Sequence, residues 1–273
     1  MCRHLAYLGP PVTVAALLFD PPHSLARQSW APRDMRGGGT INADGFGVGW
    51  YPAPGAGGAP GAGGAPGAGG APGAGAAAPL RYRRAEPLWT DVALPALAAA
   101  TTAGAVLAAV RSATVGMPVV ETAAAPFADG PWLFSMNGLV RGWPDAIAPL
   151  AAGLPTRDLL TLDAPTDAAV VWALLRHRLA GGEPPDAALA ATVRAVAAAA
   201  PGSRLNLLLT DGATAVASTA GHALSVRDDG ASVLIASEPL DEDPGWRSVP
   251  DGRLVVATPG EGVRIEPMGE ASG

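Results

Sequence analysis

Apolar and polar residues alternate in several short stretches of the first half of the chain. Alternation with a period of two residues is typical of strands that bury one face. We therefore expect strands at residues 4–9, 45–51, 80–84 and 105–113. The stretch WLFSMNGLV at 132–140 predicts a strand that an Asn-Gly turn interrupts at Asn137 and Gly138.

Longer apolar segments with polar residues at their starts predict helices. Asp91 is placed to cap a helix over 92–103, and Thr166 to cap a second over 167–180 that ends before Gly181. Asp186, which follows a double proline, is placed to cap a third over 187–200.

Strand patterns return in the last third of the chain. They cover 204–210, 213–219, 232–237 and 253–258, with a turn at Asp211 and Gly212 between the first two. Strands, then helices, then strands again indicate an α+β layered domain rather than a βαβ nucleotide-binding fold.

Residues 55–75 consist only of glycine, alanine and proline, with glycine at every third position. The stretch has too little proline for a collagen helix and no side chain that could bury apolar area, so we expect a flexible insertion at the tip of a hairpin. The predicted organisation is one domain over 2–267, interrupted by the 55–75 loop, with a tail at 268–273.

Composition and charge exclude several function classes. The formal net charge is −6 and no basic stripe is present, so we expect no nucleic-acid partner. No long apolar run or secretory signal occurs, so we expect no membrane association and a cytoplasmic location. Cys2 is the single cysteine, and the four histidines have no ligand spacing, so neither a disulfide nor a metal is expected. No cofactor is expected either.

Cys2 stands directly behind the initiator methionine. Processing aminopeptidases remove Met1 when the next side chain is small, which would free the Cys2 amine. An α-amine with a pKa of about 8 can act as the base for the thiol beside it. The alternative is that Cys2 is an ordinary small buried residue.

Several segments resemble, in order, those of the class II glutamine amidotransferases, and most closely the ergothioneine-pathway γ-glutamyl hydrolase branch of these N-terminal nucleophile hydrolases. The resemblance covers residues 1 to about 267 outside the glycine loop. It implies a four-layer αββα sandwich and hydrolysis of a γ-glutamyl amide through a Cys2 thioester. The segments are MCRHLAYLG (1–9), QSWAPR (28–33), NADGFGVGWY (42–51), VRSATVGMP (110–118), APFADG (125–130), MNGLV (136–140) and ASEPLDEDPGW (236–246).

The resemblance also implies roles for individual residues. The Asn137 amide and the Gly138 N–H would stabilise the oxyanion, since acyl transfer needs such donors. Arg111, supported by Thr114, would grip the substrate α-carboxylate with its planar fork. Asp167 would bind the α-ammonium group.

Each assignment has a structural alternative. Asn137 and Gly138 would serve equally as a turn, Arg111 as a surface ion pair, and Asp167 as part of a helix N-terminus with Thr166. Of the neighbouring motif residues, we expect Asp44 to be structural and His4 not to be the catalytic base, because the Cys2 amine already fills that role.

The substrate that the resemblance implies is a small γ-glutamyl compound, γ-glutamyl-hercynylcysteine sulfoxide. The chain departs from the family pattern at Met136, where relatives often have histidine. Two alternatives remain at this stage: a glutaminase subunit that supplies ammonia to a separate synthase, and a non-catalytic protein that binds γ-glutamyl compounds. A homo-oligomer also remains open.

Overall fold

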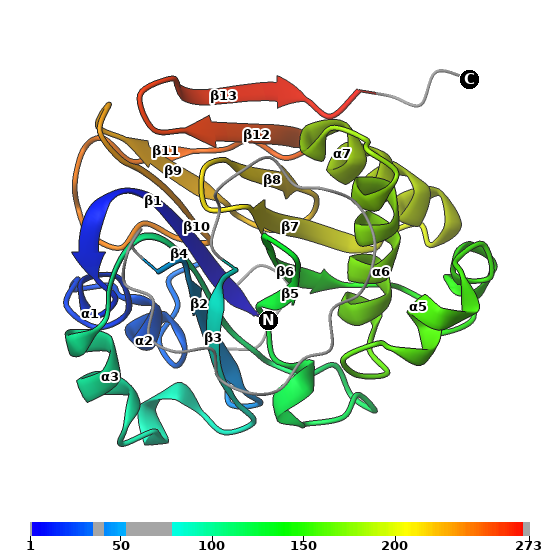
Figure 1. Ribbon diagram of the computed structural model, residues 1–273, viewed down its shortest axis with the longest axis horizontal. Helices are drawn as coiled ribbons and strands as arrows, with labels where there is room; N and C mark the ends of the chain where they lie inside the picture. Colours follow the sequence, from blue (N-terminus) through cyan, green and yellow to red (C-terminus); the bar gives the residue numbers. More distant parts are fainter. Residues whose placement is uncertain (1, 35–40, 53–77, 270–273) are drawn as a thin grey trace.

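The computed structural model describes residues 2–34, 41–52 and 78–269. Within these ranges the chain forms two antiparallel sheets that pack face to face, with helices on both outer faces (Figure 1). The predicted αββα sandwich is confirmed. Met1 and the predicted 55–75 loop lie outside the described residues.

The first sheet has the strand order β11-β9-β10-β1-β4-β2-β3. In its central strand β1, Leu5 and Tyr7 pack toward the short helices, while Ala6 and Leu8 pack toward the second sheet. This period-two burial confirms the predicted strand. The elements of this half are β1 (Arg3–Thr13), α1 (Ala15–Leu18), α2 (Leu25–Gln28), β2 (Phe46–Trp50), β3 (Leu80–Arg84), α3 (Leu94–Ala100), β4 (Thr102–Val110), β9 (Ser225–Asp228), β10 (Val233–Ala236) and β11 (Arg247–Ser248).

The second sheet has the order β13-β12-β8-β7-β6-β5, and its outer face is covered by the two long helices α6 and α7 (Figure 1). Among the described residues, no helix combines the length and the apolar character needed to cross a membrane. The elements are β5 (Phe127–Asp129), β6 (Trp132–Leu139), α4 (Ala148–Ala151), α5 (Thr156–Leu160), α6 (Asp167–Ala180), α7 (Pro185–Ala199), β7 (Arg204–Thr210), β8 (Ala215–Thr219), β12 (Arg253–Thr258) and β13 (Gly262–Pro267), with two 3₁₀ turns at Leu88–Thr90 and Glu121–Ala123.

The glycine-rich strand β2 pairs with β3, as predicted for the two sides of the hairpin. Its glycines are required by packing. A Cβ at position 47 would lie 2.3 Å from the Ala125 carbonyl oxygen, and one at position 49 would lie 2.7 Å from Leu133 Cδ1. The stretch therefore lets the two sheets approach closely, and it runs along a strand without opening a helix, unlike a phosphate-binding loop.

The helix predicted over 167–180 is confirmed, the helix predicted over 92–103 is too long, and one helix start is corrected. Helix α3 ends at Ala100, because Thr102 and Ala103 already pair with β1, so β4 covers Thr102–Val110 rather than the predicted 105–113. Thr166 accepts the Ala169 N–H at the start of α6, and Asp91 accepts the Leu94 N–H before α3. Helix α7 begins at Pro185 rather than after Asp186, because proline fits the first helical position, where its missing N–H costs nothing.

The predicted turn at Asn137 and Gly138 is wrong. Strand β6 continues through both residues, which pair with Asn206 and Leu205 of β7. A Cβ on residue 138 would lie 1.8 Å from the Arg204 carbonyl oxygen, so the glycine serves close strand contact rather than a turn.

Candidate active site

One pocket collects nearly all the site residues predicted from the sequence. Its wall includes Cys2 before β1, Arg111 and Thr114 after β4, Gly138 on β6 and Asp167 at the start of α6. Apolar residues complete it, among them Phe127 and Met136. Four distant parts of the sequence therefore meet around the thiol, and only the Asn137 side chain is absent from the wall.

Cys2 is half-buried and directly precedes β1, the central strand of the first sheet. Because Arg3 pairs with Val110, Cys2 lies beside the loop that follows β4, and its Sγ is 3.7 Å from the Ser112 carbonyl oxygen. The thiol thus faces the pocket from a fixed strand end. Removal of Met1 stays a prediction.

The loop that carries Arg111 is tied to the turn before β2. Asp44 Oδ2 accepts the Ala113 N–H at 2.8 Å, and the Arg111 N–H donates to the Gly45 carbonyl oxygen at 2.7 Å. Asp44 is therefore structural, as expected.

The Arg111 guanidinium donates to two backbone carbonyls, of Pro118 at 2.9 Å and of Asp44 at 3.3 Å. In the described part of the chain no carboxylate lies within ion-pair distance of it. A half-buried guanidinium without an anion, in a pocket wall, can bind a carboxylate from outside.

Asp167 serves the helix and the pocket together. Its Oδ2 accepts the Val140 N–H at 2.9 Å and its Oδ1 the Ala168 N–H at 2.8 Å, which fastens the end of β6 to α6. Burial raises the pKa of its carboxyl above the ordinary range, although these hydrogen bonds and the charge of Arg111 act in the opposite direction. A buried carboxylate in the wall can bind a cationic group of a ligand.

Asn137 lies between the two sheets and is 1% exposed. Its Nδ2 donates to Ser237 Oγ at 3.4 Å, while its Oδ1 has no partner among the described residues. Gly138, the next residue, does lie in the pocket wall. The pocket wall thus includes Gly138 but not the Asn137 side chain.

The His4 side chain lies on the face of β1 that packs against the second sheet. Its Nδ1 lies 3.2 Å from Ser135 Oγ. Burial, with smaller contributions from His222 and Arg3, lowers the pKa of His4 to about 3, so its imidazole is neutral at physiological pH. These contacts are those of a core histidine.

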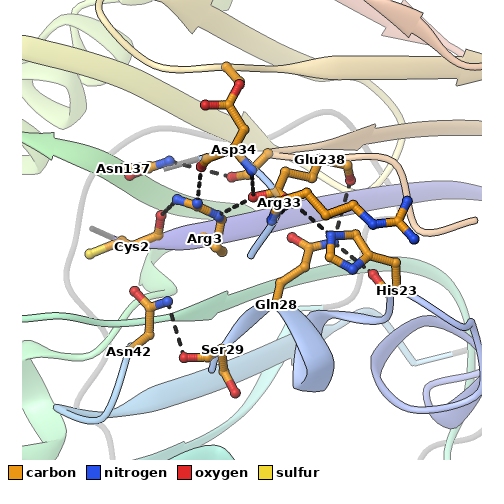
Figure 2. Close-up of polar contacts among 12 residues, drawn as sticks. Cys2, Arg3, His23, Gln28, Ser29, Arg33, Asp34, Asn42, Asn137 and Glu238 are labelled. Carbon is orange, nitrogen blue, oxygen red and sulfur yellow. Dashed lines mark hydrogen bonds and ion pairs between the residues drawn. The ribbon is translucent and has the colours of Figure 1, made fainter. Parts of the chain in front are cut away.

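A buried ionic network behind Cys2 was not predicted (Figure 2). It joins Arg3, His23 and Glu238, which are 2%, 3% and 3% exposed. The sequence did contain a sign of this network, namely charged residues beside apolar strands. Arg3 is the first residue of β1, and Glu238 comes two residues after the end of β10.

Comparison with curated proteins finds full-length relatives. The chain is 41% identical over 93% of its length to gamma-glutamyl-hercynylcysteine sulfoxide hydrolase of Mycolicibacterium smegmatis, of which it covers 95%. It is 38% identical over 100% of its length to the protein of the same name from Mycobacterium tuberculosis, of which it covers 99%. No family model matches the chain.

Solved structures share the fold at low identity. A protein of Silicibacter pomeroyi described as a glutamine aminotransferase class-II domain protein superposes with a TM-score of 0.63 at 22% identity, with 98% of this chain and 100% of that one covered. Glutamine phosphoribosylpyrophosphate amidotransferase of Bacillus subtilis gives a TM-score of 0.60 at 12% identity, with 98% of this chain and 49% of that one covered. The chain therefore belongs to the gamma-glutamyl-hercynylcysteine sulfoxide hydrolase family and has the class II glutamine amidotransferase fold.

Proposed function

We propose that the protein hydrolyses the γ-glutamyl amide bond of γ-glutamyl-hercynylcysteine sulfoxide, with glutamate and hercynylcysteine sulfoxide as products, in ergothioneine biosynthesis. The observation that carries the proposal is the pocket that sets the Cys2 thiol together with the Arg111 guanidinium and the Asp167 carboxylate. Full-length relatives that carry this activity in their names support the choice of substrate. We also propose a cytoplasmic location.

Recognition would fall to the two charged side chains. The glutamyl head carries an α-carboxylate and an α-ammonium group, which are complementary to Arg111 and Asp167. Thr114, on the same loop as Arg111, would bind at the carboxylate end. Binding of both charged groups would hold the γ-carbonyl carbon close to Cys2 Sγ in a fixed orientation. The entropic cost of bringing the reacting atoms together is then met on binding.

In the first chemical step, Cys2 Sγ would attack the γ-carbonyl carbon after its proton passes to the Cys2 α-amine. The carbonyl oxygen becomes an oxyanion next to the Gly138 N–H, with Asn137 as the second proposed donor. The carbon–nitrogen bond then breaks, and the leaving amine takes the proton from the α-ammonium group. A γ-glutamyl thioester on Cys2 remains.

In the second step, water would add to the thioester carbonyl while the free Cys2 amine accepts one of its protons. Collapse of this intermediate breaks the carbon–sulfur bond, returns the proton to sulfur and releases glutamate. The cycle consumes one water and leaves the enzyme unchanged.

The test is glutamate release from γ-glutamyl-hercynylcysteine sulfoxide compared with release from glutamine. The proposal predicts that kcat/KM for the sulfoxide exceeds that for glutamine by at least about a hundredfold, since the leaving group adds specific contacts. A preference for glutamine would instead identify a glutaminase that supplies ammonia. Binding without release from either compound would identify a non-catalytic protein.

A further inference from the structure

The Arg3 side chain is buried directly behind the nucleophile. Its Nη1 donates to the Cys2 carbonyl oxygen at 3.1 Å, its Nη2 to the Asp34 carbonyl oxygen, and its Nε to Glu238 Oε1 at 2.9 Å (Figure 2). One rigid guanidinium therefore connects the residue that carries the thiol with two other segments of the chain.

Glu238 is the acceptor at the centre of this network. Its carboxylate accepts the hydrogen bond from Arg3 Nε and three more: from His23 Nε2 at 2.6 Å, from the Arg33 backbone N–H at 2.8 Å and from the Asp34 backbone N–H at 3.2 Å. Burial opposes ionisation of Glu238, but the hydrogen bonds from His23 and Arg33 and the charge of Arg3 outweigh it and lower its pKa below the ordinary range.

The network is not explained by stability alone. A buried ion pair gives little net stabilisation, because removing both charges from water costs about as much as their attraction returns. Neither Arg3 nor Glu238 lines the pocket, so neither is placed to touch a substrate there. Their link to the site is the Cys2 backbone.

We propose that Glu238 is a positioning residue for Cys2: it orients Arg3, whose guanidinium fixes the Cys2 carbonyl, and it balances the positive charge of Arg3 next to the Cys2 thiol and amine. The proposal rests on Cys2 being the nucleophile of the proposed function. Glu238 thus acts on the reaction only through Arg3.

The charge balance has a definite sign. In Glu238→Gln the positive charge of Arg3 is left without its anion, and a nearby cation favours thiolate over thiol and neutral amine over ammonium. Both the thiol and the amine should therefore titrate at lower pH. The substitution replaces none of the other titratable or charged residues around Cys2, which are Arg111 and Asp167 in the pocket wall, Asp34 and His23 in the network, and His4 on β1, whose imidazole is neutral.

Cys2 is the only cysteine in the sequence, so the pH dependence of alkylation by iodoacetamide reports its thiolate directly. We expect the midpoint of this profile to fall by roughly one pH unit in Glu238→Gln, from the attraction of two charges several ångströms apart. We expect kcat to fall at least about tenfold while KM changes less than about threefold.

Glu242→Gln is the matched control. Glu242 lies in the same acidic segment, but its side chain is 79% exposed and pairs with the Arg33 side chain at 2.6 Å on the surface. The same chemical change there should leave the alkylation profile, kcat and KM at wild-type values.

Two further variants keep the proposal testable if Glu238→Gln folds poorly. Arg3→Lys retains the charge but loses the fork, so kcat should fall with little change in the alkylation midpoint. Arg3→Met combined with Glu238→Gln removes both charges, so the midpoint should return to the wild-type value while kcat stays low. Recovery of kcat in this double variant would overturn the proposal.

Failure of this proposal is separable from failure of the proposed function, because alkylation requires no substrate. A folded Glu238→Gln protein with a wild-type alkylation profile overturns the positioning role even if the wild-type enzyme hydrolyses the sulfoxide. A shifted profile in Glu238→Gln together with an unshifted profile in Glu242→Gln supports it even if the substrate proves to be another γ-glutamyl compound.

Discussion

Asp44 Oδ2 accepts a hydrogen bond from the backbone N–H of Ala113 at 2.8 Å. The contact ties the turn before β2 to the loop after β4, and a backbone bond from the Asp44 N–H to the Arg111 carbonyl oxygen at 3.0 Å runs beside it. The loop that carries Arg111 and Thr114 is therefore fastened by hydrogen bonds to the turn before β2.

The first prediction concerns this anchor. Asp44→Ala leaves the Ala113 N–H without its acceptor, which costs of the order of 1 to 3 kcal/mol and loosens the loop. We expect KM to rise roughly tenfold with a smaller change in kcat, measured as initial rates of glutamate release. An unchanged KM would show that the loop is held by its backbone bonds alone.

The second prediction concerns binding by Asp167. Asp167→Asn keeps the size of the side chain but removes the charge proposed to pair with the substrate α-ammonium group. A hydrogen bond between charged groups contributes about 1.5 to 3 kcal/mol, so KM should rise roughly 10- to 100-fold at pH 7. Equal KM values for the two proteins would remove Asp167 from the binding site.

Although Asp167→Asn should weaken substrate binding, it should increase stability relative to wild type as pH rises. Burial raises the folded-state pKa of Asp167, so the stability that this group contributes is present below its unfolded-state pKa and is lost as pH rises through the folded-state value. As pH rises from 4 to 7, wild type should therefore lose stability that Asp167→Asn keeps. The free energy of unfolding of the variant minus that of wild type should increase over this range. Urea unfolding at both pH values measures this, and a difference that is constant or changes in the other direction would contradict it.

The third prediction concerns His4, whose pKa is lowered to about 3 by burial. The stability it contributes is present above the unfolded-state pKa of about 6.5 and is lost as pH falls toward the folded-state value. Wild type should lose about 2 kcal/mol between pH 7 and pH 5 that His4→Gln does not lose. Parallel loss in both proteins would show that His4 is protonated in the fold.

Features of the fold and the site could be predicted where they depend on residues close together in the sequence, and not where they depend on residues far apart. The α6 boundaries depend on the local pair of Thr166 and Gly181, and the chain shows both directly. The course of β6 depends on contact with β7, more than sixty residues later, so the local Asn-Gly signal was misleading. The partnership of Arg3 with Glu238 spans 235 positions along the sequence and has no local pattern.

The fourth prediction follows from the close strand contact. Gly138→Ala places a methyl group within 1.8 Å of the Arg204 carbonyl oxygen, where only backbone movement could relieve the clash. We expect a loss of at least about 3 kcal/mol in the free energy of unfolding, or no folded protein. Gly153→Ala is the comparison variant. Its Cβ would lie 3.3 Å from the Leu150 carbonyl oxygen, a tight contact that a shift of a few tenths of an ångström relieves, so its loss in the free energy of unfolding should be much smaller than that of Gly138→Ala.

The central claim is that Cys2 is the nucleophile, and the most direct test is turnover of γ-glutamyl-hercynylcysteine sulfoxide by Cys2→Ala. Intact mass of the wild-type protein should first establish that the chain begins at Cys2. The account predicts that the variant stays folded, binds the substrate and releases glutamate at least about a thousandfold more slowly than wild type. Turnover by Cys2→Ala at the wild-type rate would contradict it.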